Sequence, residues 1–197
     1  MLRKCKVVLL LLSAVLVLSG CGNNNSYLKK GVKALEHENY SEAVQCFEDM
    51  IEAEKEYEPK KDKQKLVQEN NLFEAYKGIG TAYFETKEYD KALEAFEKCM
   101  KLEGTKTPVM YRNIAVCASM TSDYKKATEY AEDALSLISE NKDFDNDEIR
   151  EELYFIVIQN YEADGDFDSA LDWAEEYNEF YPGNEDMEKE IMFLQTR

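Results

Sequence analysis

The chain has 197 residues and a formal net charge of −17, with 41 acidic against 24 basic side chains. A field of this sign repels phosphate backbones, so nucleic acid is a poor partner and anionic lipid head groups do not attract the domain as a whole. With 44% hydrophobic and 12% aromatic residues, the chain is nevertheless able to bury a core. It is therefore not a disordered acidic tail.

The N-terminus has the layout of a secretory signal. A basic start at residues 3–6 precedes an apolar run from residue 7 to residue 18, which only Ser13 interrupts. A bilayer-spanning helix needs about twenty apolar residues, so this shorter run is typical of a signal peptide. We expect residues 1–20 to be cleaved.

The tetrapeptide Leu18-Ser19-Gly20-Cys21 follows directly. It resembles the bacterial lipobox, in which small residues precede a cysteine that is lipidated and becomes the first residue of the mature protein. The resemblance implies a lipoprotein whose Cys21 carries a diacylglyceryl group, with palmitate-type chains that hold it stably on the extracytoplasmic face of a cell membrane. Residues 21–26 then form the lipidated cysteine and a short linker. The alternative is an ordinary secretory signal with a chance cysteine, and Gly22 leaves inner and outer membrane equally open.

The mature chain has three further cysteines, Cys46, Cys99 and Cys117. An odd number argues against a disulfide framework, and the spacings do not fit a zinc site. All three fall on apolar helical faces, which predicts small buried hydrophobic side chains. One intramolecular bridge is the alternative.

Five residue slots recur four times at constant spacing. An aromatic residue is followed after four residues by a mostly small one, after nine more by an aromatic, after three by alanine, and after four by phenylalanine or alanine. The copies are Tyr27, Gly31, Tyr40, Ala43 and Phe47; Tyr76, Gly80, Tyr89, Ala92 and Phe96; Tyr111, Ala115, Tyr124, Ala127 and Ala131; and Tyr154, Ile158, Phe167, Ala170 and Ala174. Residues four apart share a helical face, so each copy predicts two packed helices. Each second helix is expected to start after a turn residue: Asn39, Glu88, Asp123 or Asp166.

This pattern resembles the tetratricopeptide repeat, whose first helix carries an aromatic, a small residue and a tyrosine, and whose second carries Ala-x-x-x-Phe. The second copy matches best, with Tyr76, Gly80, Tyr83, Ala92 and Phe96. The resemblance implies an all-α fold, an α-solenoid of about four helical hairpins at residues 27–58, 66–104, 107–140 and 148–183, closed by a capping helix at 184–197. Extra residues around 58–65 and 141–147 fall between hairpins, where insertions form loops or helix extensions.

Signatures of catalysis are weak, and we expect neither an enzyme nor a cofactor. The single histidine, His37, follows the first helix, where an exposed side chain that can carry a positive charge suits the helix C-terminus. Nucleophilic catalysis would need a base within reach of a nucleophile. No catalytic residue is predicted.

One acidic segment has the spacing of an EF-hand calcium loop, at Asp164, Asp166, Asp168, Asp172 and Glu175. Its sixth position is Ser169 where the loop requires glycine. The repeat slots Phe167 and Ala170 instead predict that a helix begins there, so no metal site is expected. The acidic segment 143–147 lies in an insertion and is freer to bind a cation weakly.

In the tetratricopeptide family the first helices line a concave groove that binds extended peptides or partner helices. The groove-facing slots of this chain are Leu28, Val32, Leu35, Lys77, Thr81, Phe84, Arg112, Val116, Ser119, Phe155, Gln159 and Glu162. Seven of them are the candidate partner-binding residues: Lys77, Thr81, Phe84, Arg112, Val116, Phe155 and Gln159. Lys77 and Arg112 are cations in an acidic chain and could receive a partner's carboxylate, although the family's carboxylate-clamp pattern is not matched. The alternative for each position is a solvated or intra-repeat contact.

Two further features have structural and functional interpretations. The basic cluster of the mature chain consists of Lys55, Lys60, Lys61, Lys63 and Lys65. It is either solvated or a docking patch for an acidic partner or the membrane surface, and the first copy begins about 20 Å of extended chain after Cys21. Trp173 is expected to pack against the C-terminal helix.

The function expected is that of a membrane-anchored adapter or receptor. It would bind a protein or peptide partner in its groove and the lipid bilayer through acylated Cys21. A solute-binding lipoprotein and an envelope-assembly factor are the alternatives.

Overall fold

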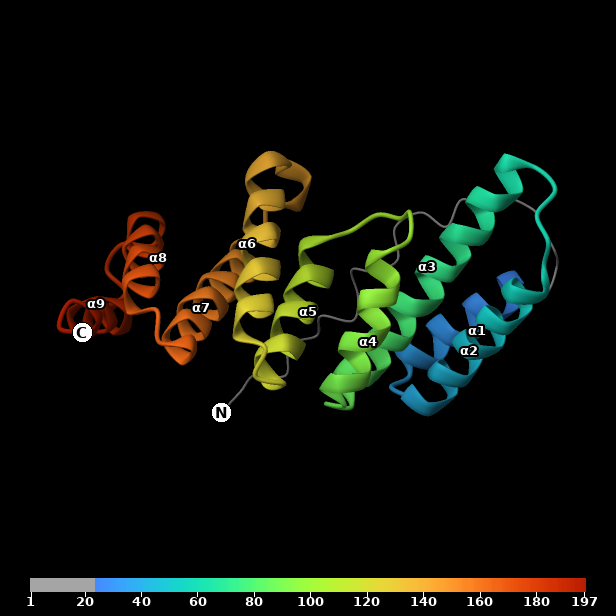
Figure 1. Ribbon diagram of the computed structural model, residues 1–197, viewed down its shortest axis with the longest axis horizontal. Helices are drawn as coiled ribbons and strands as arrows, with labels where there is room; N and C mark the ends of the chain where they lie inside the picture. The colour runs from blue at the N-terminus through green and yellow to red at the C-terminus, as the bar shows by residue number, and fades with distance from the viewer. Residues whose placement is uncertain (1–23) are drawn as a thin grey trace. The chain divides into compact units, whose positions relative to one another are not determined.

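The computed structural model describes residues 24–197, which are folded into helices and connecting turns with no strand in that range (Figure 1). The α-helices are α1 (Asn24–Glu36), α2 (Tyr40–Glu56), α3 (Asp62–Glu85), α4 (Tyr89–Met100), α5 (Pro108–Met120), α6 (Tyr124–Glu140), α7 (Asp147–Asp164), α8 (Phe167–Phe180) and α9 (Glu185–Leu194). The predicted fold class, all-α hairpins followed by a C-terminal helix, is confirmed. The predicted signal peptide and Cys21 lie outside the described residues.

The chain forms two compact units. Unit 1 contains the described residues up to Thr86, together with Glu97–Gly104. Unit 2 contains Lys87–Phe96 and Thr105–Arg197. Most of α4 therefore belongs to unit 2 and its last turn to unit 1.

The turn inside every hairpin contains a residue with left-handed backbone, five positions before the repeated alanine. These residues are Glu38, Lys87, Ser122 and Gly165, with φ between 57° and 84°. The next backbone N–H then bonds back across the helix end, as from Asp123 N to Ala118 O at 2.8 Å. This is a Schellman-type helix end, which favours glycine because a side chain in this conformation is strained. Only the last of the four turns uses a glycine there.

The predicted start of the second helices at aspartates is confirmed for α6 and α8. Asp123 accepts a hydrogen bond from Lys126 N, and Asp166 accepts one from Ser169 N at 3.1 Å. Both are side-chain caps of helix N-termini. Asn39 precedes α2 without such a cap, and its amide donates instead to Glu42 at 2.6 Å.

Two of the repeated slots on the second helices are buried in every copy. The four alanines are fully buried, namely Ala43, Ala92, Ala127 and Ala170. The slot four residues later is equally buried in each copy, at Phe47, Phe96, Ala131 and Ala174. These residues that recur in the sequence are therefore residues that are buried in every copy.

In unit 1, the ring of Phe47 fills the space beside two glycines on different helices. A Cβ added to Gly31 of α1 would lie 2.7 Å from Cε1 of the ring. A Cβ added to Gly78 of α3 would overlap the opposite ring edge, at Cε2. The two glycines let α1 and α3 approach the phenylalanine of α2. Gly31 is the small slot that the repeat predicts for α1. For α3 the repeat predicts Gly80, which is also buried, whereas the contact at Gly78 was not predicted.

The first insertion extends α3. This helix begins at Asp62 and is 24 residues long. Its extra turns are tied to the end of α2, because Gln68 Nε2 donates to the carbonyls of Glu54 (2.5 Å) and Tyr57 (3.0 Å). Asn71 Nδ2 also donates to the carboxylate of Glu54, which is only 2% exposed. A buried carboxylate must be hydrogen-bonded, so this contact fixes the extension to α2.

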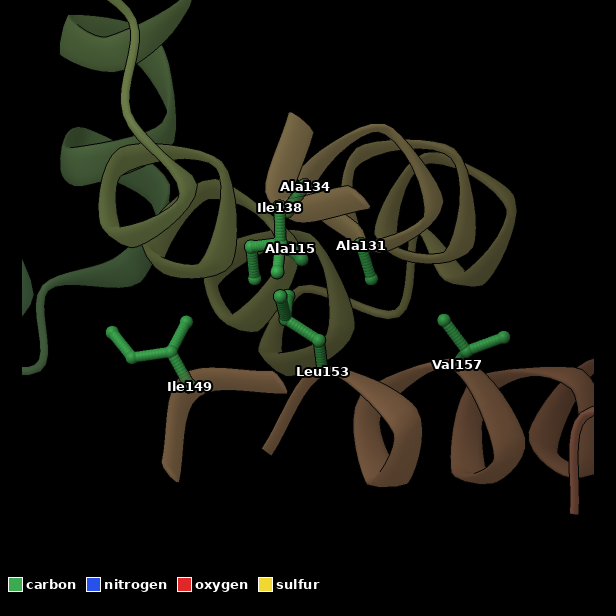
Figure 2. Packing of buried hydrophobic residues seen from close by; sticks show 7 residues of the cluster. All are labelled: Ala115, Ala131, Ala134, Ile138, Ile149, Leu153 and Val157. Carbon is green, nitrogen blue, oxygen red and sulfur yellow. The ribbon is translucent and has the colours of Figure 1, made fainter. Parts of the chain in front are cut away.

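In unit 2, α7 packs against α5 and α6 through an aliphatic core. Figure 2 shows Leu153 and Val157 of α7 pointing toward the alanines of the neighbouring hairpin. The buried residues of this cluster are Ala115, Ala131, Ala134, Ile138, Ile149, Leu153 and Val157. Small residues on α5 and α6 allow the branched side chains of α7 to approach closely.

The last hairpin and α9 share an aromatic core. Tyr154 OH donates to Glu176 at 2.7 Å and Tyr177 OH to Glu151 at 2.6 Å, which joins α7 to α8 in both directions. Trp173 packs edge-on against Tyr154 with ring centroids 5.9 Å apart. It borders a cluster that includes Met187 and Leu194 of α9 as well as the aliphatic core of α5, α6 and α7.

Candidate functional site

The predicted groove residues lie on the first helices of the hairpins, α1, α3, α5 and α7. Within unit 1, α1 contacts α3, and within unit 2, α5 contacts α7. The first helices of successive hairpins therefore lie next to each other in both units. Each unit brings its own share of the candidate residues together.

In unit 1 the candidates form a stripe along α3. Lys77, Thr81 and Phe84 are half-buried and follow each other at helical spacing. Lys77 Nζ lies 2.7 Å from a carboxylate oxygen of Glu74 and 5.4 Å from the ring centre of Phe73. A partner carboxylate at Lys77 would therefore have to join or displace Glu74.

The neighbouring positions of unit 1 are less polar. Leu28, Val32 and Leu35 of α1 are half-buried, so each retains some exposed apolar surface. The hydroxyl of Thr81 donates to the carbonyl of Lys77 at 2.9 Å, which leaves its oxygen lone pairs to accept. The stripe thus offers apolar contact and one cation that is 79% buried, since 21% of the Lys77 side chain is exposed.

In unit 2 an ion pair joins the first helices of successive hairpins. Arg112 Nε of α5 lies 3.3 Å from a carboxylate oxygen of Glu152 on α7. The arginine side chain is 13% exposed and the glutamate side chain 46% exposed. The guanidinium is therefore held in place by its own unit, and only part of it faces outward.

The remaining candidates of unit 2 change in character along the surface. Val116 and Ser119 of α5 are half-buried, and Gln159 of α7 is exposed. Phe155 is half-buried, with its ring centre 5.3 Å from that of Tyr177. The face thus passes from a cation on α5 to apolar and amide groups on α7.

A carboxyl pair closes this row at the end of α7. Partial burial and a hydrogen bond with Glu190 of α9 raise the pKa of Glu162 to about 7. Two carboxyl groups in contact cannot easily ionise together, so the Glu162 carboxyl keeps its proton to a higher pH than an ordinary glutamate. A negatively charged partner group would be repelled here whenever both are ionised.

The acidic segments are used within the fold. Arg150 pairs with Asp145 and, at 2.6 Å, with Asp147, which occupies two carboxylates of the segment 143–147. The segment with EF-hand-like spacing crosses a helix boundary, since α7 ends at Asp164 and α8, which begins at Phe167, contains Asp168, Asp172 and Glu175. This confirms the helix-start interpretation. Among residues 24–197, no group of three or more histidine, cysteine or acidic side chains is placed to hold a metal ion.

The cysteines are free thiols in the described part of the chain. Burial raises the pKa of Cys117 to about 12, and burial is also the main cause that raises the pKa of Cys46. A thiol with a raised pKa carries little thiolate at neutral pH and is a poor nucleophile. Cys99 is buried and its Sγ lies 3.4 Å from the carbonyl of Phe73, whereas Cys46 is half-buried rather than fully buried as predicted.

Within residues 24–197, no helix is long and apolar enough to span a bilayer. His37 is exposed directly after α1, as predicted.

Comparison with known proteins agrees with this geometry. Residues 71–140 match the tetratricopeptide repeat family. A crystal structure of MamA protein superposes with a TM-score of 0.65 at 17% identity, covering 87% of this chain and 80% of that one. YrrB, described as a TPR protein with an unusual peptide-binding site, gives a TM-score of 0.62 at 17% identity over 86% and 75%. No curated protein matches the chain. At these identities the likeness concerns the fold, which is of the tetratricopeptide type.

Proposed function

We propose that the chain is a membrane-anchored, extracytoplasmic interaction module, which binds a protein or peptide partner on its first helices and is tethered through lipidated Cys21. The observation that carries the binding proposal is that both units present partly exposed apolar and cationic side chains on their first helices, on α3 in unit 1 and on α5 and α7 in unit 2, in a chain with a net negative charge. Peptide binding by the structurally similar YrrB supports the same use of the fold.

The chemistry of these side chains indicates the kind of partner. Phe84, Val116 and Phe155 offer apolar area, while Lys77 and Arg112 offer cations that are already oriented by Glu74 and Glu152. A partner segment that carries apolar side chains and a carboxylate matches the apolar area and the cation that each unit presents. The carboxylate gains a charge-assisted hydrogen bond without ordering a free lysine or arginine.

Crosslinking in cells followed by mass spectrometry tests the binding surface. Lys77→Ala/Arg112→Ala should remove a recurrent crosslinked partner that the unchanged chain captures. Lys125→Ala/Lys189→Ala is the matched control, since both side chains are well exposed and lie on α6 and α9. A partner list that is the same for both double variants would contradict binding on the first helices.

The anchor is tested separately. Cys21→Ser should move the protein from the membrane fraction to the soluble fraction, because the acyl chains supply most of its membrane affinity. Retention of this variant on membranes would contradict the lipidation proposal and leave the binding proposal standing.

A further inference from the structure

One end of unit 1 is basic although the chain as a whole is acidic. Lys55 lies in the last turn of α2, Lys60 and Lys61 in the connection, and Lys63 and Lys65 in the first turn of α3. All five side chains are exposed. Within residues 55–65 they outnumber three acidic residues, which leaves a local net charge of +2 against −17 for the chain.

An exposed leucine lies within the same patch. Leu66 directly follows Lys65 on α3 and is 58% exposed. The contacts of Gln68 and Asn71 with the end of α2 hold this part of α3 in place. Cations combined with an exposed apolar side chain are typical of a surface that lies in a lipid headgroup region, where the cations meet phosphate and the apolar group reaches the acyl chains. An acidic protein partner would not require the leucine.

This patch lies at the end of unit 1 where the described chain begins. A short turn joins α1 to α2, and the start of α3 contacts the end of α2, so the start of α1, the end of α2 and the start of α3 lie at one end (Figure 1). Phe47 sets a common level, because it touches Gly31 and Gly78. From this level α1 extends about 10 Å and α3 about 24 Å toward that end, at 1.5 Å per residue. On this side of Phe47, α3 is therefore longer than α1 by roughly 14 Å.

The tether to the proposed lipid is of similar length. Cys21 precedes Asn24 by three residues, which span at most about 11 Å when fully extended. We propose that the basic end, defined as Lys55, Lys60, Lys61, Lys63, Lys65 and Leu66, rests on the anionic surface of the membrane that holds the anchor. The proposal depends on the lipidation of Cys21. The short tether keeps the lysines near lipid phosphates, so a modest local charge is enough to orient the unit.

Amine footprinting on vesicles tests this contact. The lipid-modified full-length mature chain is placed on vesicles of phosphatidylcholine, alone or with added phosphatidylglycerol, and acetylation of each lysine is followed by mass spectrometry. Lys60, Lys61 and Lys63 should react at least about threefold more slowly on the anionic vesicles. Lys125 and Lys189 in unit 2 serve as internal references and should not change. Salt at about 1 M, where the Debye length is about 3 Å, should remove most of the protection.

Two variants separate contact from other effects. Lys60→Gln/Lys61→Gln/Lys63→Gln with Leu66→Gln alters only exposed side chains and should bring Lys55 and Lys65 to their rates on neutral vesicles. The control Lys125→Gln/Lys142→Gln/Lys189→Gln should keep the protection. Equal acetylation rates of the lysines on neutral and anionic vesicles would overturn the inference. Protection that appears in native membranes but not on the pure lipid vesicles would also overturn it, because it would indicate contact with an acidic protein. The same spectra report the mass of Cys21, so loss of the anchor is distinguished from loss of the lysine contact.

Discussion

Replacement of Gly78 by alanine tests whether Phe47 is held between two helices of unit 1. In an unconstrained helix this change stabilises a protein by about 1 kcal/mol, because alanine has the higher helix propensity. At Gly78 the added methyl would overlap the Cε2 edge of the Phe47 ring. The ring has little room to withdraw, because its opposite edge lies close against Gly31 of α1. A Cβ added to Gly31 would lie only 2.7 Å from Cε1 of the ring.

The magnitude follows from these opposing effects. Overpacking of a close-packed core costs about 1–3 kcal/mol, and the pinned ring favours the upper part of this range. After the helix-propensity gain is subtracted, Gly78→Ala should lower the free energy of unfolding by about 1–2 kcal/mol. In a chain of this size each kcal/mol corresponds to about 2–4 °C in Tm.

Thermal and urea unfolding followed by circular dichroism would measure the effect in a double-mutant cycle. Phe47→Leu lowers stability by itself but removes the ring edge, so Gly78→Ala should be neutral or stabilising in that background. The reasoning is refuted if Gly78→Ala stabilises the parent protein, or if its cost is the same with leucine at position 47.

Three further outcomes follow from other parts of the structure. Ser122→Gly should raise the free energy of unfolding by about 0.5–1 kcal/mol in urea titrations, because Ser122 has a φ of 63°. Leu153→Ala should lower it by about 2–5 kcal/mol, since Leu153 is fully buried in the core of unit 2. Burial and Glu190 raise the pKa of Glu162 from 4.5 to about 7, so the folded protein binds the extra proton and stability should fall as pH rises between these values. The expected decrease in the free energy of unfolding is on the order of 1 kcal/mol after solvent screening. Between about pH 5 and pH 8, the Tm of Glu162→Gln should therefore change less with pH than the Tm of the parent protein.

The hairpins were predictable because their defining slots are buried in every copy. Ala43, Ala92, Ala127 and Ala170 are fully buried, so a larger side chain at any of them would be penalised in the same way. A constraint that repeats in space leaves a repeat in the sequence. The aspartates before α6 and α8 were predictable for a local reason, since a cap needs only its own helix end.

Contacts between hairpins were not predictable from that register. Gly78 matters because Phe47 of the previous hairpin reaches it, and a 31-residue separation leaves no local pattern. Arg112 and Glu152 likewise pair across 40 residues. The pairing of Lys77 with Glu74 is different, because residues three apart on a helix face each other and this pair could have been foreseen.

The two insertions show how similar sequence features acquire different roles through packing. In the second insertion, Asp145 and Asp147 form ion pairs with Arg150 of α7, so their charges are balanced within unit 2. In the first, the buried Glu54 and its amide partners fix the helix, while the five lysines of the basic end stay exposed and only Lys65 approaches a carboxylate, Glu69, at 3.9 Å. An exposed pair at that distance contributes little to stability. The lysines therefore have no evident part in holding the fold, which is why a role in contact with an anionic surface accounts for them better than a structural one.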